Sequence, residues 1–521
     1  MTTSAQNSTA LPDPAPQEGT QLIGGRWVPA RGGDRIAVLN PATEQPLSHV
    51  PRATGADIDD AVAAAQAAQP AWAATDPGIR AELLRQWGRL TMEHAVSLEL
   101  IECMEVGRPL GQAIPLFLAL DFVAGQVDKV TGLTLPVHSP DALGFTLREP
   151  YGVVGSIIPW NAPAAMFVGD VAPAIGAGNT IVVKPAEDAP LAALALAALA
   201  ERAGIPAGVI NVVTGYGHEA GAALAAHPGI RRMSFTGSPA VGAAVMAACA
   251  KNHTPLHLEL GGKSPQVVFA DADLDAAVPA IVRGITFNTG QICMAGTRLV
   301  VEESVRAEVV DRIAQALEAV RIGRWDEQAD MGPLINRKQK ERVMGYIEVG
   351  RKEGATLVTG GGDPGGLFVE PTLFDDVERS MRIAQEEIFG PVLSVLPVAD
   401  ESEAVAVAND TEYGLAAYLW TRDTGRAIRV AKALQAGQVT VNAGDSFQVI
   451  GAPFGGYKHS GFGRTMGADS VLNHTQSKTV VINASAVPGG PMMPPPGAAM
   501  MSPPPGGPMA PPPGFPPPTA A

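Results

Sequence analysis

The feature that most constrains this fold is an alternation of apolar runs with Ala- and Leu-rich segments between residues 152 and 242. The runs that resemble buried strands are residues 153–158, 180–183, 209–213 and 233–235, and the helical segments between them include 164–174 and 192–203. Strands that alternate with helices form a parallel sheet covered on both faces. We therefore expect an α/β fold. Lys184, Gly215 and Gly237 should lie at the carboxyl ends of strands, where such sheets bind ligands.

The 521 residues are enough for about three domains. A second α/β region is predicted over residues 261–441, with helices at 271–285 and 305–320. Residues 57–105 have helical spacing, and residues 442–465 are rich in Gly and aromatic residues, so we expect an ordered loop there. Residues 130–149 alternate and contain two prolines, which predicts an extended excursion. A late strand at 479–482, within residues 466–487, is expected to pair with it.

Both ends of the chain have compositions that are typical of loose segments. Residues 1–20 are polar with three prolines, and we expect a disordered arm. Residues 488–521 contain no charge and repeat Pro-Pro-Pro-Gly at Pro494, Pro503 and Pro511. This Pro-, Gly- and Met-rich tail is expected to be disordered with polyproline II character. The alternative is a docking segment for an unknown partner.

Charge and cysteine usage exclude several classes of function. The net charge of −15 disfavours a nucleic acid or an anionic membrane as the partner. Cys103, Cys249 and Cys293 include no close pair, which fits neither a disulfide framework nor a zinc site. We predict no metal. The first twenty residues lack the features of a secretory signal, and the longest apolar run is too short for a bilayer. A cytoplasmic location is therefore expected.

Cys293 lies in a stretch of small and flexible residues, Thr-Phe-Asn-Thr-Gly-Gln-Ile-Cys-Met-Ala-Gly-Thr-Arg at 286–298. A single cysteine of this kind is more often an ordinary buried residue. However, Glu259 lies in Leu-Glu-Leu-Gly-Gly-Lys-Ser, and Asn161 lies in Pro-Trp-Asn. A nucleophile, a base and an oxyanion donor are the groups that acyl transfer requires.

These three motifs resemble the NAD(P)-dependent aldehyde dehydrogenase superfamily. The similarity runs from about Gln21 to about Asn483. It includes Lys-Pro-Ala-Glu at 184–187, Phe-Thr-Gly-Ser at 235–238, Glu-Glu-Ile-Phe-Gly-Pro at 386–391 and Pro-Phe-Gly-Gly-Tyr-Lys-His-Ser-Gly at 453–461. Seven motifs over some 460 residues make a chance similarity improbable.

The resemblance implies a domain organisation. Residues 21–129 and 150–260 would form a Rossmann-like NAD-binding domain with a parallel sheet, and 261–441 a second α/β catalytic domain. Residues 130–149 and 466–487 would form a β-hairpin oligomerisation element that reaches a neighbouring subunit. A homodimer or homotetramer is therefore expected, the alternative being a surface hairpin without a partner.

The resemblance also implies a mechanism. The Cys293 thiolate attacks an aldehyde, and the Asn161 side chain with the Cys293 backbone N–H stabilises the oxyanion. Hydride leaves to the nicotinamide, and a thioester remains. Glu259 activates the water that hydrolyses it. A glutamate between two leucines has a simpler alternative, which is a partnered carboxylate of the core.

Several residues match positions that hold the dinucleotide in the family. The turn from Gly237 to Gly242 follows a strand and opens a helix, which favours a phosphate. Glu187 is expected to repel a 2′-phosphate, which favours NAD over NADP. The alternative for the 237–242 turn is an ordinary tight connection between strand and helix. The alternative for Lys184 and Glu187 is a solvated ion pair. The full set is Trp160, Lys184, Glu187, Gly217, Gly237, Ser238, Gly242, Glu387 and Phe389.

The substrate tunnel is predicted by family position alone. Its residues are Ala162, Met166, Gly169, Asp170, Phe287, Ile292, Met294, Phe447 and Phe454. Ala162 and Gly169 are small, which suggests space. Asp170 departs from the lysine that is common there, and the alternative is that it faces solvent.

We therefore expect NAD-dependent oxidation of an aldehyde to a carboxylate (EC 1.2.1.-), with water as the second reactant. One alternative is a CoA-acylating semialdehyde dehydrogenase. Another is a non-catalytic scaffold protein that uses the proline-rich tail. The presence of Glu259 together with Cys293 and Asn161 argues against both.

Overall fold

The computed structural model describes residues 11–112, 114–138, 140–444 and 449–484. Phe447 of the predicted tunnel and the predicted tail at 488–521 lie outside the described residues. The chain forms two compact units. One contains the described residues within Met1–Gly132 and Leu147–Lys478, and the other those within Leu133–Thr146 and Thr479–Ala521. Among the described residues, no helix combines the length and the apolar character needed to span a bilayer.

The first large sheet has eight strands, and five adjacent strands within it run parallel to one another. Across the sheet the order is β2 (Arg26–Val28), β1 (Gln21–Ile23), β9 (Ile210–Val212), β8 (Thr180–Pro185), β7 (Val153–Ile158), β10 (Arg232–Thr236), β11 (Leu256–Glu259) and β20 (Gly461–Phe462). All residues of β7 and β8 are buried, as expected for parallel strands with both faces covered. The predicted strand-helix alternation is confirmed.

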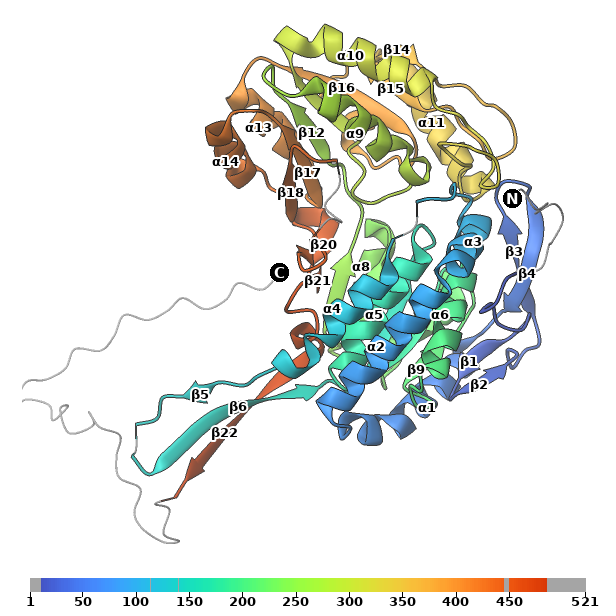
Figure 1. Ribbon diagram of the computed structural model, residues 1–521, viewed down its shortest axis with the longest axis vertical. Helices are drawn as coiled ribbons and strands as arrows, with labels where there is room; N and C mark the ends of the chain where they lie inside the picture. The colour runs from blue at the N-terminus through green and yellow to red at the C-terminus, as the bar shows by residue number, and fades with distance from the viewer. Residues whose placement is uncertain (1–10, 113, 139, 445–448, 485–521) are drawn as a thin grey trace, which may run out of the picture. The chain divides into compact units, whose positions relative to one another are not determined.

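Helices cover both faces of this sheet, and β7 shows how the faces are divided. Val154 and Ile158 pack into the core formed with α2 (Pro77–Glu93), α4 (Leu116–Ala124), α5 (Pro163–Gly176) and α6 (Leu191–Arg202). These four helices lie next to one another in Figure 1. Val153 and Ile157 face the opposite core, formed with α1 (Gly55–Ala73), α7 (Ala222–Ala226) and α8 (Pro239–Ala250). A further helix, α3 (Ala95–Val106), packs against α6.

The second large sheet has seven strands, all parallel to their neighbours except β14. The order is β14 (Thr356–Thr359), β15 (Thr372–Asp375), β16 (Val392–Val398), β13 (Arg298–Glu302), β12 (Pro265–Val268), β17 (Ala416–Trp420) and β18 (Gln438–Val441). This sheet confirms the second α/β region.

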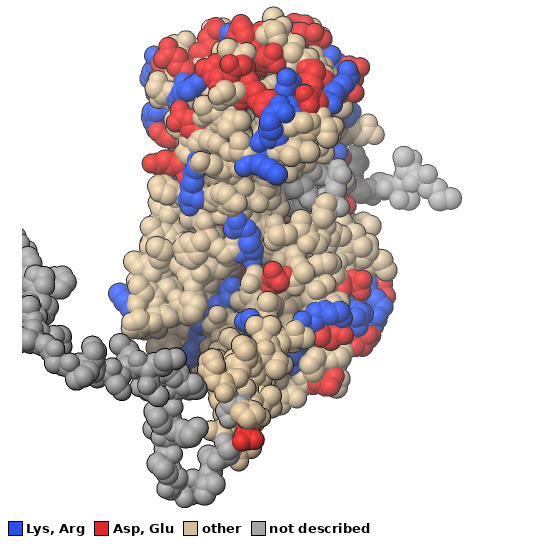
Figure 2. Space-filling view, turned by 90° about the vertical axis from the view of Figure 1, so that its left-hand side faces the viewer, with Lys and Arg blue, Asp and Glu red and all other residues tan. Residues whose placement is uncertain are grey.

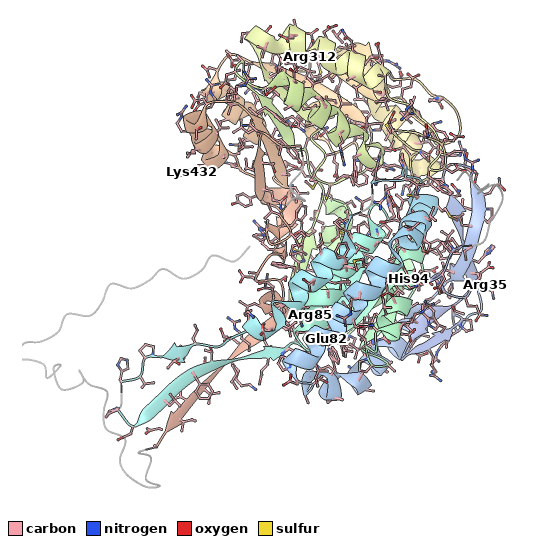
Figure 3. The ribbon with its side chains drawn as sticks, viewed as in Figure 1. Arg35, Glu82, Arg85, His94, Arg312 and Lys432 are labelled. Carbon is pink, nitrogen blue, oxygen red and sulfur yellow. The ribbon has the colours of Figure 1, made fainter. Side chains whose placement is uncertain are left out.

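Helices also cover both faces of the second sheet. One face packs against α9 (Leu274–Thr286) and α10 (Glu303–Glu318). The other packs against α11 (Arg337–Glu353), α12 (Arg382–Gln385), α13 (Glu401–Asn409) and α14 (Thr424–Ala433). In Figure 2, acidic and basic side chains are interspersed over this upper region. On α10, for example, Arg312, which is labelled in Figure 3, pairs with Asp275 and Glu308.

A separate three-stranded sheet has the order β22 (Thr475–Asn483), β6 (Ala142–Pro150), β5 (Thr134–Leu135). The predicted pairing of the late strand with the extended excursion is therefore confirmed. This sheet exposes large apolar side chains, including Leu143 (51%), Val481 (64%) and Ile482 (51%). Two-stranded sheets are formed by β3 (Arg35–Asn40) with β4 (Gln45–Pro51) and by β19 (Pro453–Phe454) with β21 (Thr465–Met466).

The described part of the N-terminal segment differs from the loose arm predicted for residues 1–20. Leu11 and Ala15 pack against the first core. Asp13 pairs with Arg202 at 2.6 Å and with His94 at 3.3 Å, and His94 is labelled in Figure 3. The prolines of this segment suggested disorder, but two apolar contacts and an ion-pair cluster order residues 11–20.

Candidate active site

The loop that carries Cys293 has an unusual backbone. It follows α9, and Asn288, Thr289 and Gly290 have φ angles of 47°, 58° and 70°. This left-handed conformation costs roughly 1–2 kcal/mol for each non-glycine residue. A Cβ at position 290 would lie 2.4 Å from the Gly390 carbonyl carbon, so this position requires glycine. Thr289 Oγ1 anchors the loop by donating to the Gly332 carbonyl at 3.0 Å.

Two amide side chains join this loop to Asn161. Asn288 Nδ2 donates to the Asn161 carbonyl at 2.9 Å, and Asn161 Nδ2 donates to the Gln291 carbonyl at 2.9 Å. Gln291 Nε2 donates to the Asn288 carbonyl, and its Oε1 accepts from the Ile335 N–H, both at 3.0 Å. Asn288 and Gln291 belong to the motif around Cys293, yet the sequence indicated no role for them. In the structure both amide side chains are buried, which indicates that they hold the loop in place.

Asn161 follows β7 and is 4% exposed. One of its two amide hydrogens is used by Gln291, so the other is available to an oxygen in the site. Glu259 ends β11 and is 5% exposed. Because β7, β10 and β11 are parallel neighbours, the carboxyl ends of β7 and β11 meet at one edge of the sheet. The fold thus brings both residues to the edge predicted for ligands.

The Glu259 carboxyl group has one bonded and one free oxygen. Oε1 lies 3.1 Å from His257 Nε2. Oε2 is buried and has no hydrogen-bond partner among the described residues. Burial raises the pKa of Glu259 well above its usual range, while Arg464 opposes this shift and Asp170 reinforces it. A carboxyl group with a free oxygen and a raised pKa is suited to proton transfer.

The Cys293 thiol is held mainly in its protonated form. Burial raises its pKa to about 12, and the nearby Glu387 and Glu259 add to the shift. Its side chain packs beside Phe454 against a small cluster of Met294, Leu415 and Tyr418. Formation of a thiolate there therefore needs a proton acceptor or a nearby positive charge.

Glu387 lies against the Gly261-Gly262 turn. Its Oε1 accepts from the Gly262 N–H at 3.1 Å, and a Cβ on Gly261 would lie 2.1 Å from its Oε2. Burial raises the pKa of Glu387 to about 7. Phe389, at a φ of 61°, sets its ring edge-on to Trp160 with 5.4 Å between centroids. The structure thus brings Phe389 and Trp160, both predicted cofactor residues, into contact.

The predicted ribose pair lies at the end of β8. Buried Lys184 donates from Nζ to Glu187 Oε2 at 3.1 Å, while the Glu187 side chain is 31% exposed. Burial tends to raise the pKa of Glu187, but Lys184 and a hydrogen bond from the backbone of Gly217 outweigh it, so the pKa is lowered. The carboxylate is ionised and reachable, as a hydroxyl acceptor needs to be.

The predicted phosphate turn opens α8. Ser238 caps this helix by accepting from the Val241 N–H at 3.5 Å. Gly237 donates its N–H to the Glu259 carbonyl at 3.0 Å. A Cβ on Gly242 would lie 2.7 Å from Leu260, so the glycine permits close packing. The exposed helix start leaves free N–H groups that favour an anion.

A cavity of about 260 Å³ lies beside the Cys293 loop. Of the predicted tunnel residues, Phe287, Ile292 and Met294 line it, whereas Ala162, Met166, Gly169 and Phe454 do not. A Cβ at Gly169 would meet no atom within 4 Å, so this position is open. The remaining lining residues, which the sequence did not indicate, are Gly111, Gln112, Ile114, Pro115, Ala280, Arg283, Gly284, Ala295, Tyr418 and Gly444.

Asp170 requires a correction, because it faces neither the tunnel nor solvent. It is 5% exposed, and its carboxylate accepts from Ser156 Oγ at 2.5 Å and from Ser234 Oγ at 3.1 Å. Both serines belong to the first sheet. The sequence prediction failed here because a helix side chain on α5 was assigned to the tunnel by position alone, whereas packing turns it towards the strands.

The fold and this site define an α/β enzyme with a cysteine nucleophile, beside a carboxyl group and an amide donor. The family profile described as "Aldehyde dehydrogenase family" matches residues 27–480. A hydroxyisobutyraldehyde dehydrogenase from Mycolicibacterium austroafricanum is 45% identical over 479 residues, which cover 89% of this chain and 94% of that protein.

Solved structures are also similar to this chain in fold and sequence. The NAD+ complex of an aldehyde dehydrogenase from Bacillus cereus is 41% identical, with a TM-score of 0.88 over 90% of this chain and 97% of that one. A structure described as the E. coli NADP dependent enzyme is 39% identical, with a TM-score of 0.87 over 89% and 98%. The chain belongs to the aldehyde dehydrogenase family, and it is an oxidoreductase that converts an aldehyde to a carboxylic acid.

Proposed function

We propose that the enzyme oxidises a small aldehyde with NAD, through a thiohemiacetal and a thioester on Cys293. The observation that carries this proposal is the hydrogen-bonded connection between the Cys293 loop and Asn161 through Asn288 and Gln291. It couples the sulfur and the amide donor in one rigid unit, which is the preorganisation that oxyanion stabilisation needs. The cavity of about 260 Å³ beside the loop suits a small substrate.

In this proposal the Cys293 sulfur forms a bond to the aldehyde carbon, and its proton passes to a base. The free Asn161 N–H and the Cys293 backbone N–H bind the oxyanion. NAD, when bound, would supply the acceptor for the hydride of the tetrahedral carbon. Glu259 then takes a proton from water as the oxygen attacks the thioester. The carbon–sulfur bond breaks, and the acid is released.

The residues at the end of β8 and at the start of α8 fit a dinucleotide. The ionised Glu187 carboxylate accepts hydroxyl groups, and the open start of α8 offers N–H groups to a pyrophosphate. Trp160, Phe389 and Glu387 would hold the nicotinamide end. We propose NAD as the preferred cofactor, because a 2′-phosphate beside Glu187 would be repelled. One relative described above is NADP dependent, so similar chains differ in cofactor.

The CoA-acylating alternative is less well supported. An enzyme in which CoA resolves the thioester has no need for a base that activates water. Here Glu259 keeps a buried oxygen without a partner among the described residues, and water is the simplest reactant for it.

We further propose a homodimer or homotetramer formed through the three-stranded sheet, and a reducing, cytoplasmic location that keeps the three free cysteines as thiols.

The deciding experiment uses Glu259→Gln, which keeps the thiol and the oxyanion donors. We expect a burst of NADH near one per active site, followed by turnover slowed by roughly 10²–10⁴-fold, the usual contribution of a general base. Rapid mixing measures the burst, and intact mass spectrometry detects the acyl adduct.

Cys293→Ala should lose both the burst and the adduct. If Glu259→Gln shows neither, Glu259 also activates the thiol or serves only the fold. If CoA clears the adduct of the unmutated enzyme faster than water does, the acylating alternative is correct.

A further inference from the structure

A row of polar side chains crosses the first sheet beneath Glu259. Ser156, Ser234 and His257 occupy the same register position on β7, β10 and β11, so they share one face. Glu259 is two residues beyond His257 on the same strand and therefore lies on that face too. Asp170 of α5 packs over the row. All five residues are buried, with exposed fractions of 5% or less.

These groups form a continuous hydrogen-bonded chain between two carboxyl groups. Glu259 Oε1 lies 3.1 Å from His257 Nε2, and His257 Nδ1 lies 3.3 Å from Ser234 Oγ. Ser234 Oγ lies 3.1 Å from Asp170 Oδ1. Each link joins a group that can donate to one that can accept.

The chain has two complete hydrogen-bonding patterns. In the first, Glu259 is protonated and donates to Nε2, Nδ1–H donates to Ser234, and the Ser234 hydroxyl donates to an ionised Asp170. In the second, every bond is reversed, so Asp170 carries the proton and Glu259 is ionised. The patterns differ by the transfer of one proton, and neither creates a charged imidazole.

We propose that Asp170 is the proton store for Glu259, reached through His257 and Ser234, and that this relay lets Glu259 accept a proton from water while it is itself protonated. Oε2 receives the proton of the attacking water, and Oε1 gives its own proton to His257 Nε2. Nδ1–H passes to Ser234, and the Ser234 proton passes to Asp170. The balance is one proton gained by Asp170 and one hydroxide equivalent added to the thioester carbon.

The relay resolves a conflict within the site. Burial raises the pKa of Glu259 well above its ordinary value, which favours the protonated carboxyl group and leaves less of the carboxylate to act as a base. The pKa of Asp170 is also raised by burial, but its two serine donors and Arg232 counter the shift. Asp170 thus has more partners that favour its ionised form than Glu259 has. Burial lowers the pKa of His257 to about 3, which keeps the ring neutral and able to change tautomer.

The surrounding charges agree with this assignment. Arg232 and Arg464 both disfavour a positive His257, and Arg464 also favours an ionised Glu259. His474, whose pKa burial lowers well below its usual range, is the other imidazole near His257. On the substrate side, the Cys293 thiol is the titratable group that senses Glu259.

The inference rests on the proposed role of Glu259, and its test separates the two. p-Nitrophenyl acetate acylates a thiol without hydride transfer, so its burst measures acylation and its slow phase measures hydrolysis of the acyl-enzyme. We would record the slow phase from pH 5.5 to 10 for the unmutated enzyme, Ser234→Ala and Asp170→Asn. Both substitutions are close in size to the original residue.

In a variant that interrupts the relay, Glu259 must lose its proton to solvent before it can act as a base. The acidic limb of the pH profile of the slow phase should therefore move up in Ser234→Ala by at least about one pH unit, which is a tenfold loss at neutral pH. Asp170→Asn should move up less, because it also removes a negative charge that raises the pKa of Glu259. Activity should return towards the unmutated rate at high pH, and the burst should remain. Ser234→Thr, which retains the hydroxyl, should return the acidic limb of the pH profile to its position in the unmutated enzyme. Ser156→Ala removes a donor to the same carboxylate but lies off the path, so its limb should move less than that of Ser234→Ala.

An unshifted limb in Ser234→Ala, which leaves both carboxyl groups in place, would overturn the relay, as would a loss that is equal at every pH. If Ser234→Ala is unshifted while Glu259→Gln stalls, only the relay is wrong. If Glu259→Gln hydrolyses its acyl-enzyme at the unmutated rate, the proposed function of Glu259 is wrong as well.

Discussion

Cys293 is surrounded by groups that hold its proton in place. Its pKa is raised to about 12 by burial, by Glu387 and by Glu259. A thiol in this state reacts slowly until a neighbour removes the proton or a positive charge approaches. We therefore expect the free enzyme to react slowly with alkylating agents and oxidants at Cys293.

The contribution of Glu387 can be measured by alkylation. Glu387→Gln removes a negative charge beside the sulfur, which lowers the pKa of Cys293 and increases the thiolate fraction at a given pH. At pH 8.5 we expect iodoacetamide to label Cys293 about three- to tenfold faster, because one pKa unit corresponds to a factor of ten.

Glu386→Gln is the matched control. The Glu386 carboxylate pairs with Arg382 at 2.7 Å and accepts from Tyr346 at 2.5 Å. Its loss should leave the labelling rate of Cys293 unchanged. Equal rates in the two variants would show that Glu387 does not act on the thiol through its charge.

Glu187 allows a second test at the scale of one side chain. Glu187→Gln keeps the size of the residue but removes the charge opposite a 2′-phosphate. We expect KM for NAD to rise several-fold and the NADP to NAD ratio of kcat/KM to rise by at least about tenfold, about 1.4 kcal/mol of discrimination.

The neighbouring Asp188→Asn is the control, since Asp188 accepts from Asn336 at 3.2 Å and lies outside the predicted cofactor set. It should leave the ratio nearly unchanged. An unmutated enzyme that already uses both cofactors equally would contradict the role of Glu187.

At the scale of elements, the Cys293 loop stores backbone strain that its contacts offset. Gly290→Ala adds a Cβ in a left-handed position only 2.4 Å from the Gly390 carbonyl carbon. We expect the free energy of unfolding to fall by at least about 2 kcal/mol, together with a large loss of kcat. Chemical denaturation and steady-state assays measure the two effects.

Gly345→Ala is the contrasting substitution. Gly345 lies within α11, and a Cβ there would meet no atom within 4 Å. Alanine should therefore stabilise the protein by about 0.5–1 kcal/mol without changing kcat. If Gly290→Ala were as harmless as this control, the loop would not hold the conformation described above.

At the scale of the whole molecule, the three-stranded sheet exposes the apolar side chains that an assembly would cover. Leu143, Val481 and Ile482 are all more than half exposed. A hydrophobic strand in this state is a typical subunit contact or an aggregation site. The double variant Val481→Lys/Ile482→Lys places one charge on each face of β22.

We expect this variant to shift the protein to smaller species in light scattering coupled to size exclusion. Lys478→Ala, on the same strand but already polar, should keep the original mass. An unmutated enzyme that is monomeric at micromolar concentration would contradict the assembly role of this sheet.

Much of the architecture could be predicted from the sequence. Uninterrupted apolar runs such as Val153–Ile158 fit strands buried on both faces, and their alternation with helices indicates a parallel sheet. Parallel strands bring their carboxyl ends to one edge of the sheet. The order of strands along the chain is therefore enough to predict that Lys184, Gly215 and Gly237 lie at a common edge, whereas Asn161 and Glu259 are indicated by their motifs.

The tertiary structure alone decided which side chains face one another. The sequence shows Asp170, Ser234 and His257 as isolated polar residues in apolar segments, and only the register of β10 with β11 and the packing of α5 place them in one row. The same holds for Gln291, which acts on Asn161 across 130 residues of chain. Local periodicity predicts that a residue is buried, because burial depends on its own element. Its partner depends on how distant elements pack, and no local pattern records this.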